Sequence, residues 1–186
     1  GHARSGCIPA GGNTQCGSSL GCHDARVDSA EKQRRSAVDG ARAAHRGLIE
    51  DIKNLSDEQA RSASLLPNWS IGHVLTHIAR NGDSFTRMMT AAINGDVVSQ
   101  YDGGHERRSA DIEAGAARPA AELIADVTGS ASRLEAVWDA MTPEAWAGHG
   151  VNAGGETWKC EAMPFHRWRE VAVHHVDAGI GYTAAD

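Results

Sequence analysis

The last part of the chain contains the nine-residue run Arg169-Glu170-Val171-Ala172-Val173-His174-His175-Val176-Asp177. On an α-helix, a spacing of four residues places two side chains on one face, one turn apart. Glu170 and His174 are therefore predicted to point in the same direction. Pro164 before the run suits the first turn of a helix, and Gly179 after it suits a helix end. Because burying a carboxylate and an imidazole without a partner is costly, the run predicts a helix that faces other helices and holds a polar site.

A second histidine-bearing helix completes this pattern. His77 lies much earlier in the chain, in a helix-patterned segment from Ile71 to Ile93. Two imidazoles and one carboxylate make three ligands, which suits a zinc ion that keeps one position for water or substrate. His175 is the weaker ligand candidate, because five positions from Glu170 place it on another side of the helix. Taken one at a time, these histidines are more often core or surface residues with ordinary partners.

The rest of the chain also favours helices. Ser70 is the expected N-cap of the segment that carries His77, and Pro119 is expected in the first turn of a third helix. The connection from Asp96 to Arg118 is expected to be a long polar loop, and residues Thr142 to Met163 to contain a turn and a short extended piece. The first two long helices show apolar residues at steps of three and four: Val38, Ala41, His45, Leu48, Ile52 and Leu55, then Leu75, Ile78, Gly82, Phe85, Met89 and Ile93. The fold class predicted is all-α, a four-helix bundle with one long crossover loop and a metal site between helices.

The beginning of the chain differs in character. Residues 1–26 contain six glycines and three of the four cysteines, without a helical period. We expect a flexible extension that includes a tag scar, followed by a single domain at 27–186. The irregular spacing of Cys7, Cys16 and Cys22 does not favour a zinc knot, and nothing demands a disulfide framework. A reducing cytoplasm is the expected location.

Charge and hydropathy narrow the class of partner. The formal net charge is −6, which argues against nucleic acid as the main partner. No apolar run approaches the length of a membrane span, so no membrane partner is expected.

Two motifs resemble a known family. The segment Leu66-Pro67-Asn68-Trp69-Ser70-Ile71-Gly72-His73-Val74-Leu75-Thr76-His77-Ile78-Ala79-Arg80-Asn81 resembles the first metal-ligand motif of the mycothiol-dependent maleylpyruvate isomerases, and residues 169–177 resemble the second. The similarity runs from about Ser36 to Tyr182. The resemblance implies a DinB-like bundle, mycothiol as the thiol cofactor, and metal ligation by His77, Glu170 and His174.

The chemistry follows from a thiol at an open metal site. A coordinated thiol is deprotonated, and the thiolate can attack an electrophilic small molecule. If the adduct later expels the thiol, the result is cis–trans isomerisation; if a leaving group departs or the adduct persists, the result is thiol S-transfer. Family members carry a further C-terminal domain, whereas this chain stops four residues after Tyr182, so isomerisation of maleylpyruvate itself stays open. The alternatives are metal-assisted hydrolysis, with Asp177 or Glu161 as base, and a non-catalytic binding module.

Several further residues are expected at the site. Arg80 and Arg167 are expected to hold a substrate carboxylate, since guanidinium binds carboxylate through two hydrogen bonds; Arg169 is also available. The thiol is expected to contact His73, Arg80 and Asn81, with His73 not a metal ligand. Asp177 and His175 are candidates to orient the ligands. The remaining candidates lie in the long connection and could reach over a pocket, although a solvated loop is the expected place for each, namely Tyr101, Arg107 and Arg108.

Overall fold

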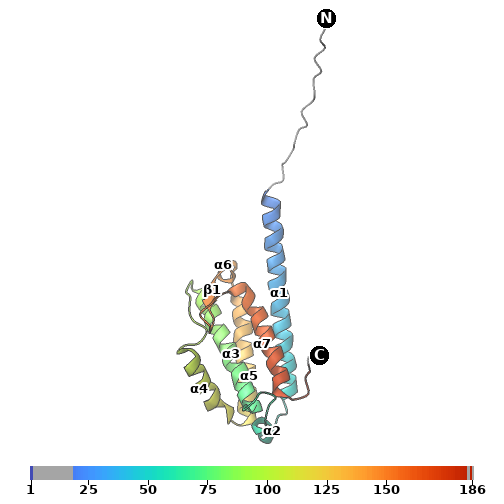
Figure 1. Ribbon diagram of the computed structural model, residues 1–186, viewed down its shortest axis with the longest axis vertical. Coiled ribbons are helices and arrows are strands. Elements are labelled where there is room, and N and C mark those ends of the chain that lie inside the picture. Colours follow the sequence, from blue (N-terminus) through green and yellow to red (C-terminus); the bar gives the residue numbers. More distant parts are fainter. Residues whose placement is uncertain (2–18, 184, 186) are drawn as a thin grey trace.

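Four long helices form the body of the molecule in the computed structural model, which describes residues 1, 19–183 and 185 (Figure 1). These helices are α1 (Ser19–Ile52), α3 (Ile71–Ile93), α5 (Ala120–Ala140) and α7 (Met163–Ala178). The shorter elements are α2 (Asp57–Arg61), α4 (Gly104–Ala116), α6 (Pro143–Trp146), the strands β1 (His149–Val151) and β2 (Thr157–Lys159), and the 3-10 turn η1 (Cys160–Ala162). The predicted all-α four-helix bundle is confirmed.

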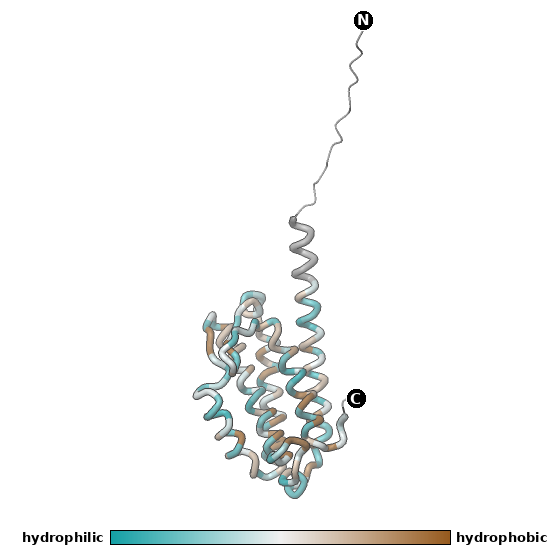
Figure 2. The backbone as a smooth tube through the Cα atoms, viewed as in Figure 1, coloured by the Kyte–Doolittle hydropathy of each residue, from teal (hydrophilic) through white to brown (hydrophobic). Residues whose placement is uncertain are grey.

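The bundle is closed by contacts between neighbouring long helices. The most extensive contacts join α3 to α5 and α1 to α7, and α3 also packs on α7. Hydrophobic and hydrophilic stretches alternate along these helices (Figure 2), as expected for helices with one buried face. The buried residues form two clusters along the bundle, one including Leu48, Val74, Leu75, Leu123 and Val171 and the other Phe85, Met88, Met89, Leu134 and Met163.

Local sequence signals set the ends of the helices as expected. Ser70 is the N-cap of α3: its hydroxyl accepts from the backbone N–H of His73, while Nδ1 of His73 accepts from the backbone N–H of Ser70 at 3.1 Å. This capping box satisfies two donors that a helix start would leave free. In the last helix, Gly179 ends α7 with a φ of 69°, a left-handed conformation that glycine adopts without strain.

The segment from Asp96 to Arg118 differs from the expected loop, because it contains helix α4. This helix has no strong apolar period, and its buried residues are Ile112 and Ala116. It forms because it packs on α3, which approaches closely at Gly72. Tertiary contact, which a local pattern does not reveal, therefore stabilises α4.

The first helix also begins earlier than expected. It starts at Ser19 rather than near Val27, so the expected boundary after residue 26 falls within α1. The part of the expected extension at residues 2–18, with Cys7 and Cys16, lies outside the described residues.

The expected turn and extended piece is a small hairpin. β1 pairs antiparallel with β2, with His149 opposite Lys159. Within the described part of the chain, no helix is long and apolar enough to cross a membrane.

The contact between α3 and α4 is testable by adding one methyl group. A Cβ at Gly72 would lie 2.2 Å from the carbonyl oxygen of Ala116, so Gly72→Ala must push α4 away. We expect a loss of about 1–3 kcal/mol in the free energy of unfolding, the usual cost of overpacking.

The control is Gly47→Ala, since Gly47 lies in α1 and a methyl group added there would meet nothing within 4 Å. This change should stabilise by roughly 0.5–1 kcal/mol through helix propensity alone. Chemical denaturation measures both variants, and an unchanged stability of Gly72→Ala would contradict the close packing.

Candidate metal centre

Three side chains from two helices meet between α3 and α7. His77 comes from α3, and Glu170 and His174 come from α7, one turn apart. Their ligand atoms all lie within 4.8 Å of one another. Nε2 of His77 is 3.5 Å from Oε2 of Glu170, and Nε2 of His174 is 3.8 Å from the same oxygen. The structure thus brings together the three residues that the sequence singles out.

The centre is partly open to solvent. The side chain of His77 is 3% exposed, whereas Glu170 and His174 are 28% and 20% exposed. Among the described residues, no other histidine, cysteine, aspartate or glutamate joins the cluster. Three ligands with an accessible side are the donor set that a catalytic metal uses.

His174 is held in an orientation that suits a metal ligand. Its Nδ1 is 2.8 Å from Oδ2 of Asp177, so Nδ1 carries the proton and Nε2 presents its lone pair toward Glu170. A carboxylate that fixes the tautomer of a histidine in this way is typical of metal sites. The expectation that Asp177 orients a ligand agrees with this contact.

His77 has a different partner. Nη2 of Arg108, on α4, lies 3.0 Å from Nδ1 of His77. Because a guanidinium only donates, Nδ1 is the acceptor, and the proton of the neutral ring is on Nε2, which faces Glu170. A metal bound at Nε2 requires the proton on Nδ1 instead. Arg108 would then have to leave this nitrogen.

Burial and charge set the ionisation of the centre. Burial lowers the pKa of His77 to about 4, despite the opposing hydrogen bond to Glu170. The pKa of Glu170 is lowered mainly by that hydrogen bond with His77, and further by the charges of His77, His174 and Arg169. At neutral pH the centre therefore offers a neutral imidazole and a carboxylate, the forms that bind a divalent cation. These residues fit a metal ion.

His73 lies on the same side of α3 but has other partners. Its Nδ1 belongs to the capping box with Ser70, and its Nε2 is 3.3 Å from Oε2 of Glu113. The ring also stacks on Trp69, with centroids 6.0 Å apart. His73 lies outside the three-residue cluster.

The two arginines expected to hold a substrate are otherwise engaged. Arg80 pairs with Asp126 and lies 3.2 Å from Asp83. Arg167 is fully buried inside the bundle, where no substrate carboxylate can reach it.

Arg108 is the residue whose contact with the cluster the sequence does not indicate, since a solvated loop is its expected place and a position over a pocket only the alternative. It borders a cavity of about 250 Å³ together with Arg80, Ser84, Gln100 and Tyr101. Its guanidinium also lies over the ring of Tyr101, 5.6 Å from the centroid. Only the packing of α4 on α3 brings this arginine to His77, and no local signal in the sequence reveals that contact.

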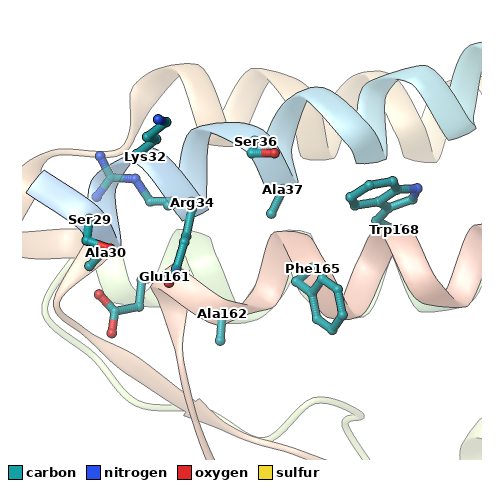
Figure 3. A pocket seen from close by; sticks show the side chains of 11 residues that line it. Ser29, Ala30, Lys32, Arg34, Ser36, Ala37, Glu161, Ala162, Phe165 and Trp168 are labelled. Carbon is teal, nitrogen blue, oxygen red and sulfur yellow. The ribbon is translucent and has the colours of Figure 1, made fainter.

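Two other candidates lie away from the centre. Nε2 of His175 is 3.0 Å from Oδ2 of Asp51, and its ring stacks on Tyr182. Glu161 lines a separate cavity of about 710 Å³ between α1 and the beginning of α7, with Phe165 and Trp168 (Figure 3). Neither His175 nor Glu161 is therefore placed to act on a ligand at the three-residue cluster.

Comparison with known proteins agrees with the fold. The family model for the mycothiol maleylpyruvate isomerase N-terminal domain matches residues 41–179. The crystal structure of the mycothiol-dependent maleylpyruvate isomerase superposes with a TM-score of 0.78 at 25% identity, covering 82% of this chain and 63% of the isomerase chain. A mutant of that enzyme gives the same TM-score and coverage at 24% identity. This chain thus spans less than two thirds of the isomerase.

A more distant structure shares the fold. YfiT from Bacillus subtilis, described as a probable metal-dependent hydrolase with an unusual four-helix bundle topology, superposes with a TM-score of 0.63 at 12% identity. The match covers 80% of this chain and 86% of YfiT. No curated protein sequence matches the chain significantly.

The buried histidine predicts how the metal-free protein responds to pH. In the unfolded chain His77 titrates near 6.5, whereas in the folded protein its pKa is about 4. Between these values only the unfolded state takes up the proton, so stability is fully present above pH 6.5 and falls as the pH drops toward 4. His45, whose pKa burial also lowers, acts in the same direction.

We expect the contribution of His77 to the free energy of unfolding of the metal-free protein to decrease by up to about 1.4 kcal/mol per pH unit in this window. Urea denaturation at several pH values measures it. His77→Gln should flatten the pH dependence, and the exposed His149→Gln should not. An identical slope in His77→Gln and the parent protein would contradict the assignment.

Proposed function

The chain belongs to the mycothiol maleylpyruvate isomerase N-terminal domain family, and from this premise we propose that it is a metal-dependent enzyme that uses mycothiol against an electrophilic small molecule. The observation that carries the proposal is the cluster of His77, Glu170 and His174, whose ligand atoms lie within 4.8 Å of one another. Zinc or another divalent metal is the proposed cofactor, since this donor set does not distinguish between them.

Each residue of the cluster has a proposed role. His77 and His174 supply neutral nitrogen ligands, and Glu170 supplies the anionic one. Asp177 keeps the proton of His174 on Nδ1, 2.8 Å away, so that Nε2 stays available. A bound divalent metal would lower the pKa of a thiol that reaches it, giving a nucleophilic thiolate at neutral pH.

Arg108 is the proposed contact for an anionic part of the substrate or thiol. It is part-buried beside His77, and among the described residues no carboxylate pairs with it. Arg80 borders the same cavity but is already paired with Asp126. A guanidinium without an ionic partner is the better site for a carboxylate, because no existing ion pair has to break.

Both outcomes of thiol addition stay within the proposal. Isomerisation requires that the adduct expel the thiol after bond rotation, and S-transfer requires that the product keep it. The same three ligands serve both. The family membership supports mycothiol as the thiol, and the electrophile is proposed only as a small molecule with an activated carbon.

Hydrolysis is the less favoured alternative. It requires a general base close to a metal-bound water. Asp177 already bonds to His174, and Glu161 faces the cavity against α1 (Figure 3). The likeness to YfiT supports a shared fold, and no observation in the described part of the chain provides the base.

The metal assignment predicts the behaviour of ligand variants. Protein purified without added metal should contain one divalent ion per chain, which elemental analysis measures. Dialysis against zinc should give the same stoichiometry. His77→Ala and His174→Ala should each abolish stoichiometric binding while keeping the helical circular dichroism. Glu170→Gln should weaken retention, because it removes the anionic ligand. The control is His73→Ala, which should keep full metal occupancy. Full metal occupancy in His77→Ala would refute the site.

The thiol assignment predicts a strict co-substrate requirement. Metal-loaded protein should bind mycothiol, by calorimetry, and the metal-free protein should not. Maleylpyruvate and quinone-like acceptors are then offered with and without mycothiol. Turnover that persists without any thiol would favour hydrolysis, and failure of the loaded protein to bind thiol would leave a binding module.

The role of Arg108 is separable from that of the metal ligands. Arg108→Gln should keep one metal per chain, because the side chain is not a ligand, and should raise KM or lower kcat/KM by about 10-fold or more, the usual cost of a lost charged hydrogen bond. Arg107→Gln is the matched control, since Arg107 precedes it on α4 and pairs with Asp111 at 2.8 Å. Equal effects of the two variants would argue against a specific role for Arg108.

A further inference from the structure

A guanidinium is buried in the bundle on α7, about one turn before the candidate metal ligand Glu170. Arg167 is completely inaccessible to solvent, and no carboxylate among residues 29–183 forms an ion pair with it. Its Nε donates to Nε2 of His45 at 3.0 Å, and its Nη1 donates to the carbonyl of Ile78 at 2.9 Å and to Oδ1 of Asn81 at 2.8 Å. Burial of a charge in this way is expensive, which indicates a role in addition to packing.

The contact with Asn81 fixes the orientation of its amide. Because a guanidinium only donates, the amide oxygen must face Arg167, and Nδ2 must point the other way. Nδ2 of Asn81 indeed faces Oε2 of Glu170 at 3.4 Å. Asn81 is itself 3% exposed, so no solvent competes for the amide. Arg167 and Glu170 are thus joined by one oriented side chain.

A second series of hydrogen bonds connects Arg167 to α1 and α5. Nε2 of His45 accepts from Arg167, so the proton of this neutral ring is on Nδ1, which donates to Oε1 of Glu135 at 2.8 Å. Burial lowers the pKa of His45, in agreement with a neutral ring. These hydrogen bonds from α1 and α5 hold the guanidinium of Arg167 in place, and they thereby fix its position relative to Asn81.

The geometry points to Arg167 and Asn81 as positioning residues that hold the carboxylate of Glu170 in place for a metal ion. This inference rests on the metal centre proposed above, and it assigns Arg167 a role different from contact with a substrate. Glu170 lies on a partly open helix face, with its side chain 28% exposed, so without the Asn81 amide its carboxylate can rotate toward solvent. Hydrogen-bond partners that orient metal ligands commonly change metal affinity by about 10–100-fold.

The test is zinc affinity measured by competition with a chromophoric chelator. Asn81→Leu removes the donor to Glu170 at similar volume, and we expect it to weaken zinc binding by about 10–100-fold. Ser84→Ala is the matched control, because Ser84 lies one turn further along α3, is equally buried and donates to the carbonyl of Asn81. Its zinc affinity should stay within about threefold of the parent protein.

A second pair of variants distinguishes a specific loss of zinc affinity from a general loss of stability. Arg167→Met should weaken zinc binding as Asn81→Leu does, whereas Leu134→Ala, a core change in the other hydrophobic cluster, should lower the melting temperature and leave zinc affinity unchanged. If Arg167→Met does not fold, Asn81→Leu still decides. The visible absorption of the cobalt-substituted protein should change in Asn81→Leu, since the coordination of Glu170 is altered, and should be unchanged in Leu134→Ala.

The outcomes are distinguishable from failure of the proposed function. If the parent protein binds no stoichiometric zinc, the metal centre itself is wrong. If the parent protein binds zinc and both Asn81→Leu and Arg167→Met bind it equally well, with an unchanged cobalt spectrum, the metal centre stands and the positioning role is refuted.

Discussion

The arrangement of ionisable side chains inside a helical bundle is the constraint on which the rest of this structure depends. Charged and polar groups removed from water must find partners, or the fold loses stability. Between α3 and α7 the partners of each group are specific: His174 has Asp177, Asn81 has Arg167, and His77 has Arg108. The carboxylate of Glu170 lies among them and faces two imidazoles, so the site is arranged around one part-buried anionic position.

The bundle gives this arrangement its rigidity. The helices that carry the cluster are fixed along their length by two hydrophobic clusters, and α4 covers α3 on the side where Arg108 reaches His77. A ligand set taken from packed helices is held more closely than one taken from loops. The same scaffold also carries a separate cavity at Phe165 and Trp168, which shares no residue with the metal centre (Figure 3).

The arginines show why side-chain type and helical face are insufficient to assign a role. Arg80, Arg108 and Arg167 all lie close to the cluster, but one is paired with carboxylates, one contacts a candidate ligand, and one is enclosed in the core. Their different environments therefore give the three arginines different possible roles. A paired guanidinium stabilises the fold, a part-buried one without an ionic partner can take an anion, and an enclosed one can only orient its neighbours.

The sequence by itself determined the features that depend on local periodicity, whereas the tertiary structure decided what covers each face. The spacing of Glu170 and His174, the capping of α3 by Ser70 and the end of α7 at Gly179 all follow from the geometry of a single helix. The two motifs together also indicated the bundle.

By contrast, α4 replaces an expected loop because it packs on α3 rather than through an apolar period of its own. Arg108 reaches His77 through that packing, and α1 and α5 close over Arg167 with His45 and Glu135. Such contacts arise when faces of different helices meet. The pattern of residues along one helix shows which face is buried, but it carries no information about which side chains of other helices will cover that face.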